Sequence, residues 1–553
     1  MDQFTFHMLF FFLLIADVNV YISCSKSLNA YRLIQYEINN TQYGSQYSSL
    51  NYIGCYFKSD CLRKIALVPL NEIKSYSEID NILNSTANAI LFIIPNNTYS
   101  ENNNNNEFNL FLNEFQINLS NKTIYLPVYF TYENEAILSS LNYLKNEFAF
   151  NSKQEKKNFL DYLGISQNFL YFSLKIKDPI LKNTLILENF YGFLEAKSKT
   201  ESVNPIIAIV THYDNFGIVN ELTNGINDNG SGIIALLELI RTLSKYYENN
   251  NNNNNNNMNE IKYDILFLLT SAGNLNFEGT NYFLNNLEPQ ISDNLQYVLC
   301  LDSIGDLNEK NLYMHLSRFP KEEEFTPNLL YEIFNKTAKK NKIGLNYEKK
   351  KIYLSNVYVP WQHEQFSKKK ILSATLSSKK SVNTDNNFNR VLINDNELNK
   401  KTLIKNIKFI AESILTFLFT NINNNNTVNV INRIKNDEDL VDENNINRMI
   451  NNIKNISRYP INIEKNSKFN NYLFKYFNGY LHKVKRQNFE YNEIKFYENN
   501  SGEIKIYNVK SKMIDLYLLI GILIYLLIIY IYTKGIKNFI VGLKESFESD
   551  SDY

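Results

Sequence analysis

The feature that most constrains the fold is an alternation, between residues 200 and 420, of short apolar runs with longer amphipathic stretches. The apolar runs, which we predict to be strands, are 206–210, 265–269, 297–301 and, as a weaker candidate, 371–376. The amphipathic stretches 233–243 and 403–418 carry apolar residues at helical spacing. Strands without a polar face belong in a parallel sheet that is covered on both sides. The sequence therefore predicts an α/β fold: a mostly parallel, mixed sheet with helices on both faces.

Length and composition narrow the class of protein. The chain has 553 residues, enough for roughly two to four domains. Lys and Arg together number 57, and so do Asp and Glu. A protein that binds nucleic acid through its overall charge needs a basic excess, so we expect no nucleic-acid partner. With four Cys and five His, the sequence also disfavours a disulfide-dense scaffold and a Cys-rich zinc protein.

The N-terminus has the outline of a signal peptide. The apolar run 8–15 gives way to small and polar residues at 23–25, and we predict a signal peptide over 1–23. The segment before the run holds Asp2 and no Lys or Arg, which departs from the usual pattern. The alternative is a buried N-terminal strand.

A second apolar run lies near the C-terminus. Residues 516–532 form seventeen positions without a charge, and the flanking residues extend the span toward the roughly 30 Å of a bilayer core. We predict a transmembrane helix over 514–533 and a cytosolic tail over 534–553; the alternative is a buried core helix. The flanking lysines are balanced, so the signal peptide sets the expected orientation: single-pass type I, with the bulk of the chain lumenal.

Lumenal placement has two consequences. Cys55 and Cys61 could form a disulfide in an oxidising compartment. The sequons beginning at Asn84, Asn121 and Asn335 become possible glycan sites, which would make the chain a glycoprotein.

The remaining segments carry weaker signals. Residues 24–175 hold strand-like runs at 90–94 and 123–130 but no motif, so their fold is not predicted. Residues 430–512 read as a polar, β-leaning, membrane-proximal region. Asn-rich tracts at 102–106, 249–257 and 423–426 are expected to form solvent loops, because polar tracts cannot bury apolar area.

Polar residues gather where the predicted strands end. Residues 211–214 follow the first strand, 270–274 the second and 302–305 the third, and the Gly-rich loop 225–232 leads into a helix. In open α/β sheets, ligands bind beyond the carboxyl ends of the strands. His212, with carboxylates near it, is therefore a candidate metal ligand.

Structural roles explain the same residues without a metal. His212 and Asp214 could form a hydrogen-bonded pair that holds their loop. Asp228 could cap the helix that follows it, and Asp302 could do the same for its own turn.

The motifs HYD (212–214), GINDNGSG (225–232), FEGT (277–280), CLDSIG (300–305) and WQHEQF (361–366) with ILSATLSS (371–378) occur in this order. In order and spacing, the chain resembles the zinc aminopeptidase-like M28 family, and within it the nicalin-like, nicastrin-related membrane proteins of the endoplasmic reticulum. The resemblance implies an aminopeptidase-like domain over 176–422, between a lumenal N-terminal region (24–175) and the membrane-proximal region.

The resemblance also implies which site residues persist. His212 falls on the first metal ligand with Asp214 behind it, Asp228 on the bridging ligand, and Asp302 on a further ligand. The general-base and ligand glutamates of active members fall on Gly273 and Asn274. No histidine occurs in residues 378–385, where the last ligand is expected. We therefore expect no catalytic residue, no cofactor and no bound metal, with a single residual zinc as the most that His212, Asp228 and Asp302 would hold.

For function, the resemblance implies a non-catalytic membrane protein of the endoplasmic reticulum. It would be a subunit of a translocon-associated complex that assists insertion and folding of multi-pass membrane proteins. Its expected partners are a large lumenal β-sandwich protein, a small polytopic membrane protein and the translocon. The alternatives are a nicastrin-type subunit of an intramembrane protease and an active aminopeptidase of the secretory pathway.

Overall fold

The computed structural model describes residues 26–73, 75–95, 104–153, 169–174, 176, 178–197, 203–252, 261–306, 311–382, 393, 395–420, 440–454, 456–465, 467–498, 501–509 and 513–534. The predicted signal peptide and residues 535–553 of the predicted tail lie outside these ranges.

The central feature is the predicted sheet, which has eight strands in the order β16-β15-β17-β14-β12-β13-β11-β18. Their bounds are β11 Leu185–Leu194, β12 Ile206–His212, β13 Asp264–Thr270, β14 Leu295–Leu301, β15 Asn311–Leu316, β16 Gly344–Lys349, β17 Ser373–Ser377 and β18 His482–Tyr491. The four strands predicted from apolar runs are the adjacent parallel strands β17, β14, β12 and β13. Antiparallel pairings attach β15 and the edge pair β11–β18, so the mostly parallel, mixed sheet is confirmed.

Helices cover both faces of this sheet, as a fully apolar strand requires. Alternate residues of β12 belong to different cores: Ile207 and Ile209 pack with α6, α9, α11, α13 and α15, whereas Ala208 and Val210 pack with α7, α8 and α10. The bounds are α6 Gly232–Asn252, α7 Glu278–Asn285, α8 Pro289–Asn294, α9 Phe325–Lys340, α10 Gln362–Lys368, α11 Lys400–Phe419, α13 Glu443–Lys454 and α15 Ser467–Tyr480.

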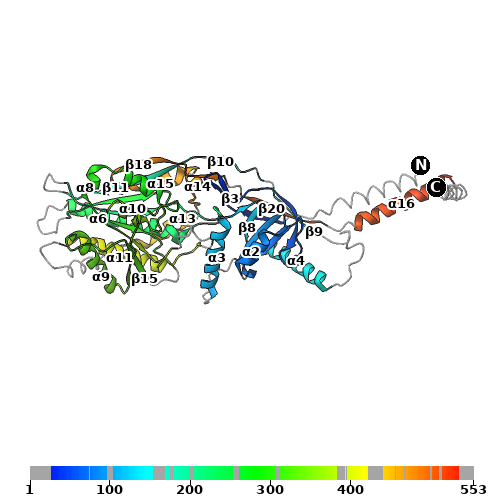
Figure 1. Cartoon of the computed structure of the whole chain (residues 1–553), viewed down its shortest axis with the longest axis horizontal. Coiled ribbons are helices and arrows are strands. Elements are labelled where there is room, and N and C mark those ends of the chain that lie inside the picture. The colour runs from blue at the N-terminus through cyan, green and yellow to red at the C-terminus, as the bar shows by residue number, and fades with distance from the viewer. Residues whose placement is uncertain are drawn as a thin grey trace.

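A closed barrel forms the second part of the fold, which the sequence did not predict (Figure 1). Its strand order is β1-β20-β9-β4-β5-β6-β8, with bounds β1 Lys26–Arg32, β4 Leu50–Tyr56, β5 Ile65–Pro69, β6 Ala89–Ile94, β8 Val128–Tyr132, β9 Phe169–Leu174 and β20 Gly502–Val509. The helices beside it are α2 Tyr76–Leu83, α3 Asn104–Ser120 and α4 Glu135–Lys153. The side chains of Ile218, Val219 and Leu222, which follow β12, pack in the core shared by α2 and α3 and so join the two parts.

A small five-stranded sheet, β10-β19-β2-β3-β7, completes the β structure. Its strands are β2 Gln35–Ile38, β3 Thr41–Ser45, β7 Thr123–Ile124, β10 Leu181–Lys182 and β19 Ile494–Tyr497. The last three strands of the chain thus enter three different sheets: β18 the eight-stranded sheet, β19 this one and β20 the barrel.

Two sequence expectations need correction. The region 430–512 was expected to be β-leaning, but α13, α14 (Pro460–Lys465) and α15 precede its strands, because their apolar residues recur at helical spacing and pack into the sheet core. The Asn-rich tracts were expected to be loops, yet α3 begins at Asn104 and α6 continues to Asn252. Each helix therefore extends into the neighbouring tract.

The ends of the described chain bear on the remaining expectations. Cys55 and Cys61 are joined by a disulfide, as predicted. Helix α16 (Met513–Lys534) stands apart from the sheets (Figure 1), and none of its described side chains, 517–530, is buried. Over the residues that the structure describes, no helix is both long and apolar enough to cross a membrane.

Candidate functional site

The carboxyl ends of the parallel strands meet at one edge of the eight-stranded sheet, where the sequence placed the candidate residues. His212 is the last residue of β12 and is in register with Thr270, the last residue of β13. Asp302 follows the end of β14 directly. Asp228 lies in the turn η2 (Ile226–Ser231), which leads into α6 at Gly232. The structure therefore brings His212, Asp228 and Asp302 to the same sheet edge.

His212 is buried and is held by Asn229. The side-chain amide nitrogen of Asn229 lies 3.2 Å from Nδ1 of His212 and donates to the carbonyl oxygen of His212 at 3.0 Å. Burial lowers the pKa of His212 to about 4, although the charge of Asp228 opposes this shift. The imidazole is therefore neutral at physiological pH.

Asp214 is buried beside Gly273 rather than paired with His212. Its carboxylate accepts a hydrogen bond from the backbone N–H of Gly273 at 2.7 Å. Burial raises the pKa of Asp214 to about 6, and the backbone hydrogen bond acts in the other direction. The described hydrogen bonds thus join His212 to Asn229 and Asp214 to Gly273, which differs from the predicted pair.

Asp228 forms an ion pair with Lys379, whose Nζ lies 2.5 Å from Oδ2 of Asp228. The hydroxyl of Ser303 lies 3.3 Å from Oδ1 of Asp228 and 3.2 Å from Oδ1 of Asp302. Burial acts to raise the pKa of Asp228, but the charge of Lys379 and its hydrogen bond bring it below the ordinary value. The main contact of Asp228 is therefore with a cationic side chain, and not the helix cap that the sequence suggested.

Two further carboxylates that are partly buried lie near this pair. Burial and the charge of Asp228 raise the pKa of Asp302 to about 7. Asp395 accepts hydrogen bonds from the backbone N–H groups of Asn227, at 3.1 Å, and Asp228, at 2.8 Å. Burial raises the pKa of Asp395 to about 6.

Arg458 holds the backbone next to the site. Its guanidinium donates to the carbonyl oxygen of Tyr213 at 3.1 Å, to that of Asn224 at 3.0 Å, and to that of Gly225. Arg458 therefore connects the loop after β12 with the turn that carries Asp228.

Sequence reasoning missed Lys379, Asp395 and Arg458. Lys379 had a usable signal, because it directly follows the ILSATLSS segment, where the resemblance places a histidine ligand. Asp395 and Arg458 had none, since their partners are distant in the sequence and no motif marks them.

The residues present do not fit a dinuclear zinc site. In the described part of the chain, no group of three or more His, Cys, Asp or Glu side chains is arranged to hold a metal ion. Asp228, where the resemblance places the bridging ligand, is engaged by an ammonium group, which has no lone pair to donate and repels a cation. The residue at 273 has no side chain, and the imidazole of His212 lies against it.

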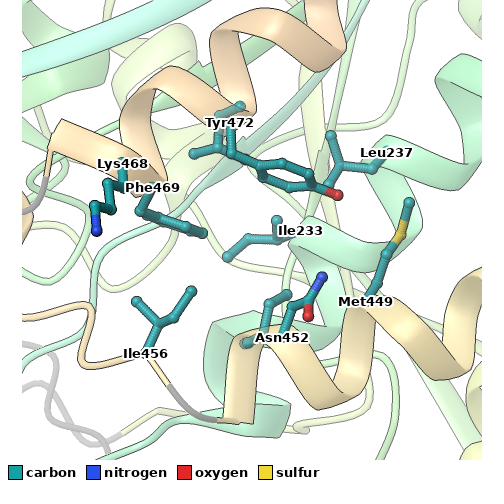
Figure 2. A pocket seen from close by; sticks show the side chains of 10 residues that line it. Ile233, Leu237, Met449, Asn452, Ile456, Lys468, Phe469 and Tyr472 are labelled. Atoms are coloured by element: carbon teal, nitrogen blue, oxygen red, sulfur yellow. The ribbon is translucent and has the colours of Figure 1, made fainter.

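A cavity in the described part of the chain lies away from this edge. It has a volume of about 350 Å³ and lies between α6, α13 and α15 (Figure 2). Apolar side chains line most of it, with Asn452 and Lys468 as polar members. It shares no lining residue with the cluster around Asp228.

Comparisons with known proteins agree with this geometry. The model of peptidase family M28 matches residues 190–396, the span of most of the eight-stranded sheet. The human protein named BOS complex subunit NCLN is 26% identical over 530 residues, which cover 94% of this chain and 91% of the human one. The Caenorhabditis elegans protein named nicalin is 28% identical over 411 residues, covering 70% of this chain and 69% of its own length. The chain is thus similar to the nicalin proteins over most of its length.

The likeness to known proteins also extends beyond the M28 segment. The crystal structure of the γ-secretase component nicastrin superposes with a TM-score of 0.56 at 12% identity, covering 87% of this chain and 99% of nicastrin. At this identity, the likeness concerns the fold alone. The superposed part of this chain is longer than the segment that the M28 model matches.

Proposed function

We propose that the chain is a non-catalytic subunit of a BOS-type complex in the endoplasmic reticulum membrane, which assists insertion and folding of multi-pass membrane proteins. The observation that carries the proposal is the extent of the likeness: 26% identity to human BOS complex subunit NCLN over 94% of the chain. A match of this length includes the barrel strands and the C-terminal strands as well as the M28-like segment.

The lack of peptidase activity is part of this proposal. Hydrolysis by M28-type sites needs a base that takes a proton from water. Gly273, at the position of that base, cannot take a proton, and Asn274 replaces the carboxylate ligand beside it. Lys379 supports the same proposal, because its ammonium group occupies one oxygen of Asp228. The absence of bound metal remains a prediction.

The proposed membrane topology is single-pass type I. The uncharged run 516–532 makes up most of α16, and its described side chains are exposed, as those of a lipid-facing helix would be. The run extends beyond the described side chains at both ends. The signal peptide over 1–23 would place the barrel and the M28-like domain in the lumen, consistent with the disulfide between Cys55 and Cys61.

We propose the partners that the resemblance implies: a large lumenal β-sandwich protein and a small polytopic membrane protein, associated with the translocon. The test is affinity purification of the full chain in mild detergent, followed by mass spectrometry. We expect both partners and translocon subunits in stoichiometric amounts. Recovery with a presenilin-like protease would favour a nicastrin-type subunit, and recovery of the chain alone would contradict the proposal.

A variant with a different membrane anchor tests whether the partners bind the lumenal part of the chain or its membrane helix. Replacing 516–532 with an unrelated single-pass anchor of equal length keeps the protein in the membrane but removes the native helix. We expect the partners to co-purify at reduced yield, because the run offers a single small residue, Gly521, for close helix packing. Complete loss of the partners would place the specific interface in the membrane.

A further inference from the structure

The cluster at the sheet edge has the outline of an M28 metal site, yet its centre holds a lysine. We propose that the ammonium group of Lys379 does the structural work of the missing metal: it is a fixed internal cation that holds the turn carrying Asp228 against the end of β14. This inference concerns the site itself and holds whichever complex the chain joins.

The backbone of Lys379 is anchored, so its side chain starts from a fixed point. The N–H of Lys379 donates to Oγ of Ser377 at 3.1 Å, and its carbonyl oxygen lies 2.8 Å from Nε2 of His315. The preceding residue, Ser378, donates its N–H to the carbonyl oxygen of Ser303 at 3.0 Å. The end of β17 is thereby tied to the loop after β14.

Acidic side chains converge on this lysine from three segments. Asp228 in η2 makes the direct contact at 2.5 Å, and the charges of Asp302 and Asp395 also act on Lys379. Carboxylates gathered in a partly buried place repel one another unless a cation lies among them. In an M28 enzyme that cation is metal; here the chain supplies it.

Ser303 links the two carboxylates of Asp228 and Asp302 and belongs to the loop after β14. It lies between Asp228 and Asp302, with its hydroxyl 3.3 Å from one carboxylate and 3.2 Å from the other. Its φ of +46° is in the left-handed region, which non-glycine residues seldom adopt. The loop after β14 thus takes an unusual backbone conformation where it meets the Asp228–Lys379 pair.

Two consequences separate this role from that of an ordinary surface ion pair. The fold should not depend on zinc, because the cation is covalently part of the chain. Removal of the ammonium alone should be costly, whereas removal of both charges should not, because a single unpaired charge in a partly buried site is the costly state.

The test uses the full chain in detergent, with thermal unfolding followed through the fluorescence of Trp361, the chain's one tryptophan. The variants are Lys379→Met, Lys379→Arg and the double variant Asp228→Asn/Lys379→Met. The matched control is Lys336→Met, because Lys336 also lies 2.5 Å from a carboxylate, that of Glu332, but on the exposed face of α9.

We expect Lys379→Met to lower the melting temperature much more than the control does. Lys379→Arg should melt close to the wild type. The double variant should recover at least half of the decrease in melting temperature that Lys379→Met causes. Amide exchange in 225–231 and 302–305 should speed up in Lys379→Met. A chelator and added zinc chloride should leave the wild-type melting temperature unchanged.

Three results would overturn the inference. The first is that Lys379→Met melts like the control. The second is that the melting temperature of the double variant falls by as much as the two single substitutions together. The third is that chelation lowers the wild-type melting temperature. If Lys379→Met does not fold, the double variant decides: its recovery supports the inference, and its failure to fold overturns it.

Discussion

Gly273 lies against the imidazole of His212 so closely that a Cβ atom on Gly273 would be 2.1 Å from Cγ of the histidine. The resemblance to M28 enzymes places a metal ligand at His212 and the general base at Gly273. The imidazole therefore occupies the space into which a side chain at 273 would project. A side chain at 273 and the present position of the His212 imidazole are therefore incompatible.

We predict that restoring an acid at 273 damages the fold and does not restore activity. Gly273→Glu and Gly273→Ala should both lower the melting temperature, and Gly273→Glu should show no turnover of amino-acid amides with added zinc. Gly479→Ala in α15 is the matched control, because a Cβ there meets nothing within 4 Å, and it should be neutral or slightly stabilising. Wild-type melting of Gly273→Ala would contradict the contact.

We predict that Glu238→Ala is strongly destabilising, by about 3–5 kcal/mol, because it leaves Arg241 buried without its partner. Glu238 is fully buried on α6 and accepts hydrogen bonds from Nε of Arg241 at 3.0 Å, from the N–H of Asp442 at 2.8 Å and from the side chain of Asn445 at 2.9 Å. It therefore attaches the start of α13 to α6.

The measurement for Glu238→Ala is denaturation in urea, followed through Trp361. Glu332→Ala removes the same side chain from an exposed ion pair on α9 and should change stability by less than about 1 kcal/mol. Equal effects of the two substitutions would show that Glu238 does not hold α13 in place.

Glu364, on α10, gives a prediction about pH. Burial raises the pKa of Glu364 from 4.5 to about 7, with Lys350 and Lys368 acting in the other direction. The folded chain thus holds this proton more tightly than the unfolded chain, and the free energy of unfolding falls as pH rises from about 4.5 to about 7. Above that range, the contribution of Glu364 is constant.

Glu364→Gln should therefore flatten the pH dependence and be more stable than the wild type at pH 8. The check is a series of melting temperatures between pH 4.5 and 8, with Glu332→Gln as an exposed control. A variant that follows the wild-type curve throughout would contradict the assignment.

The parallel centre of the large sheet was predictable, and the barrel was not. Strands β12, β13 and β14 can be recognised in the sequence because each is a short run that is apolar on both faces. The barrel joins β1 to β20 across almost the whole chain, and no local pattern encodes such a pairing. Strands such as β15, in which Asn and His interrupt the apolar residues, do not stand out from their surroundings.

Some residues of the site could likewise be predicted from the sequence and others could not. His212, Asp228 and Asp302 were predicted at one sheet edge because each follows a strand or a Gly-rich turn within a recognisable motif. Lys379 and Arg458 act through tertiary contacts, so their roles depend on where β17 and the segment before α14 pack. A motif indicates where a ligand would be expected, and the folded chain is needed to show which side chains lie at that place.

The disulfide between Cys55 and Cys61 gives a prediction about both stability and compartment. It closes the connection between β4 and β5 in the barrel, whereas Trp361 directly precedes α10, which packs on the eight-stranded sheet. Closing so short a loop stabilises a fold by about 2 kcal/mol in the chain-entropy model. A Cys55→Ala/Cys61→Ala variant should therefore show faster amide exchange in β4 and β5 while unfolding at Trp361 is nearly unchanged.

In protein taken from cells with its free thiols blocked, mass spectrometry should find these two cysteines linked and Cys300, which is buried and free, reduced. A chain in which all three are found as thiols would contradict the lumenal topology, because a disulfide of this kind persists in an oxidising compartment and not in the cytosol.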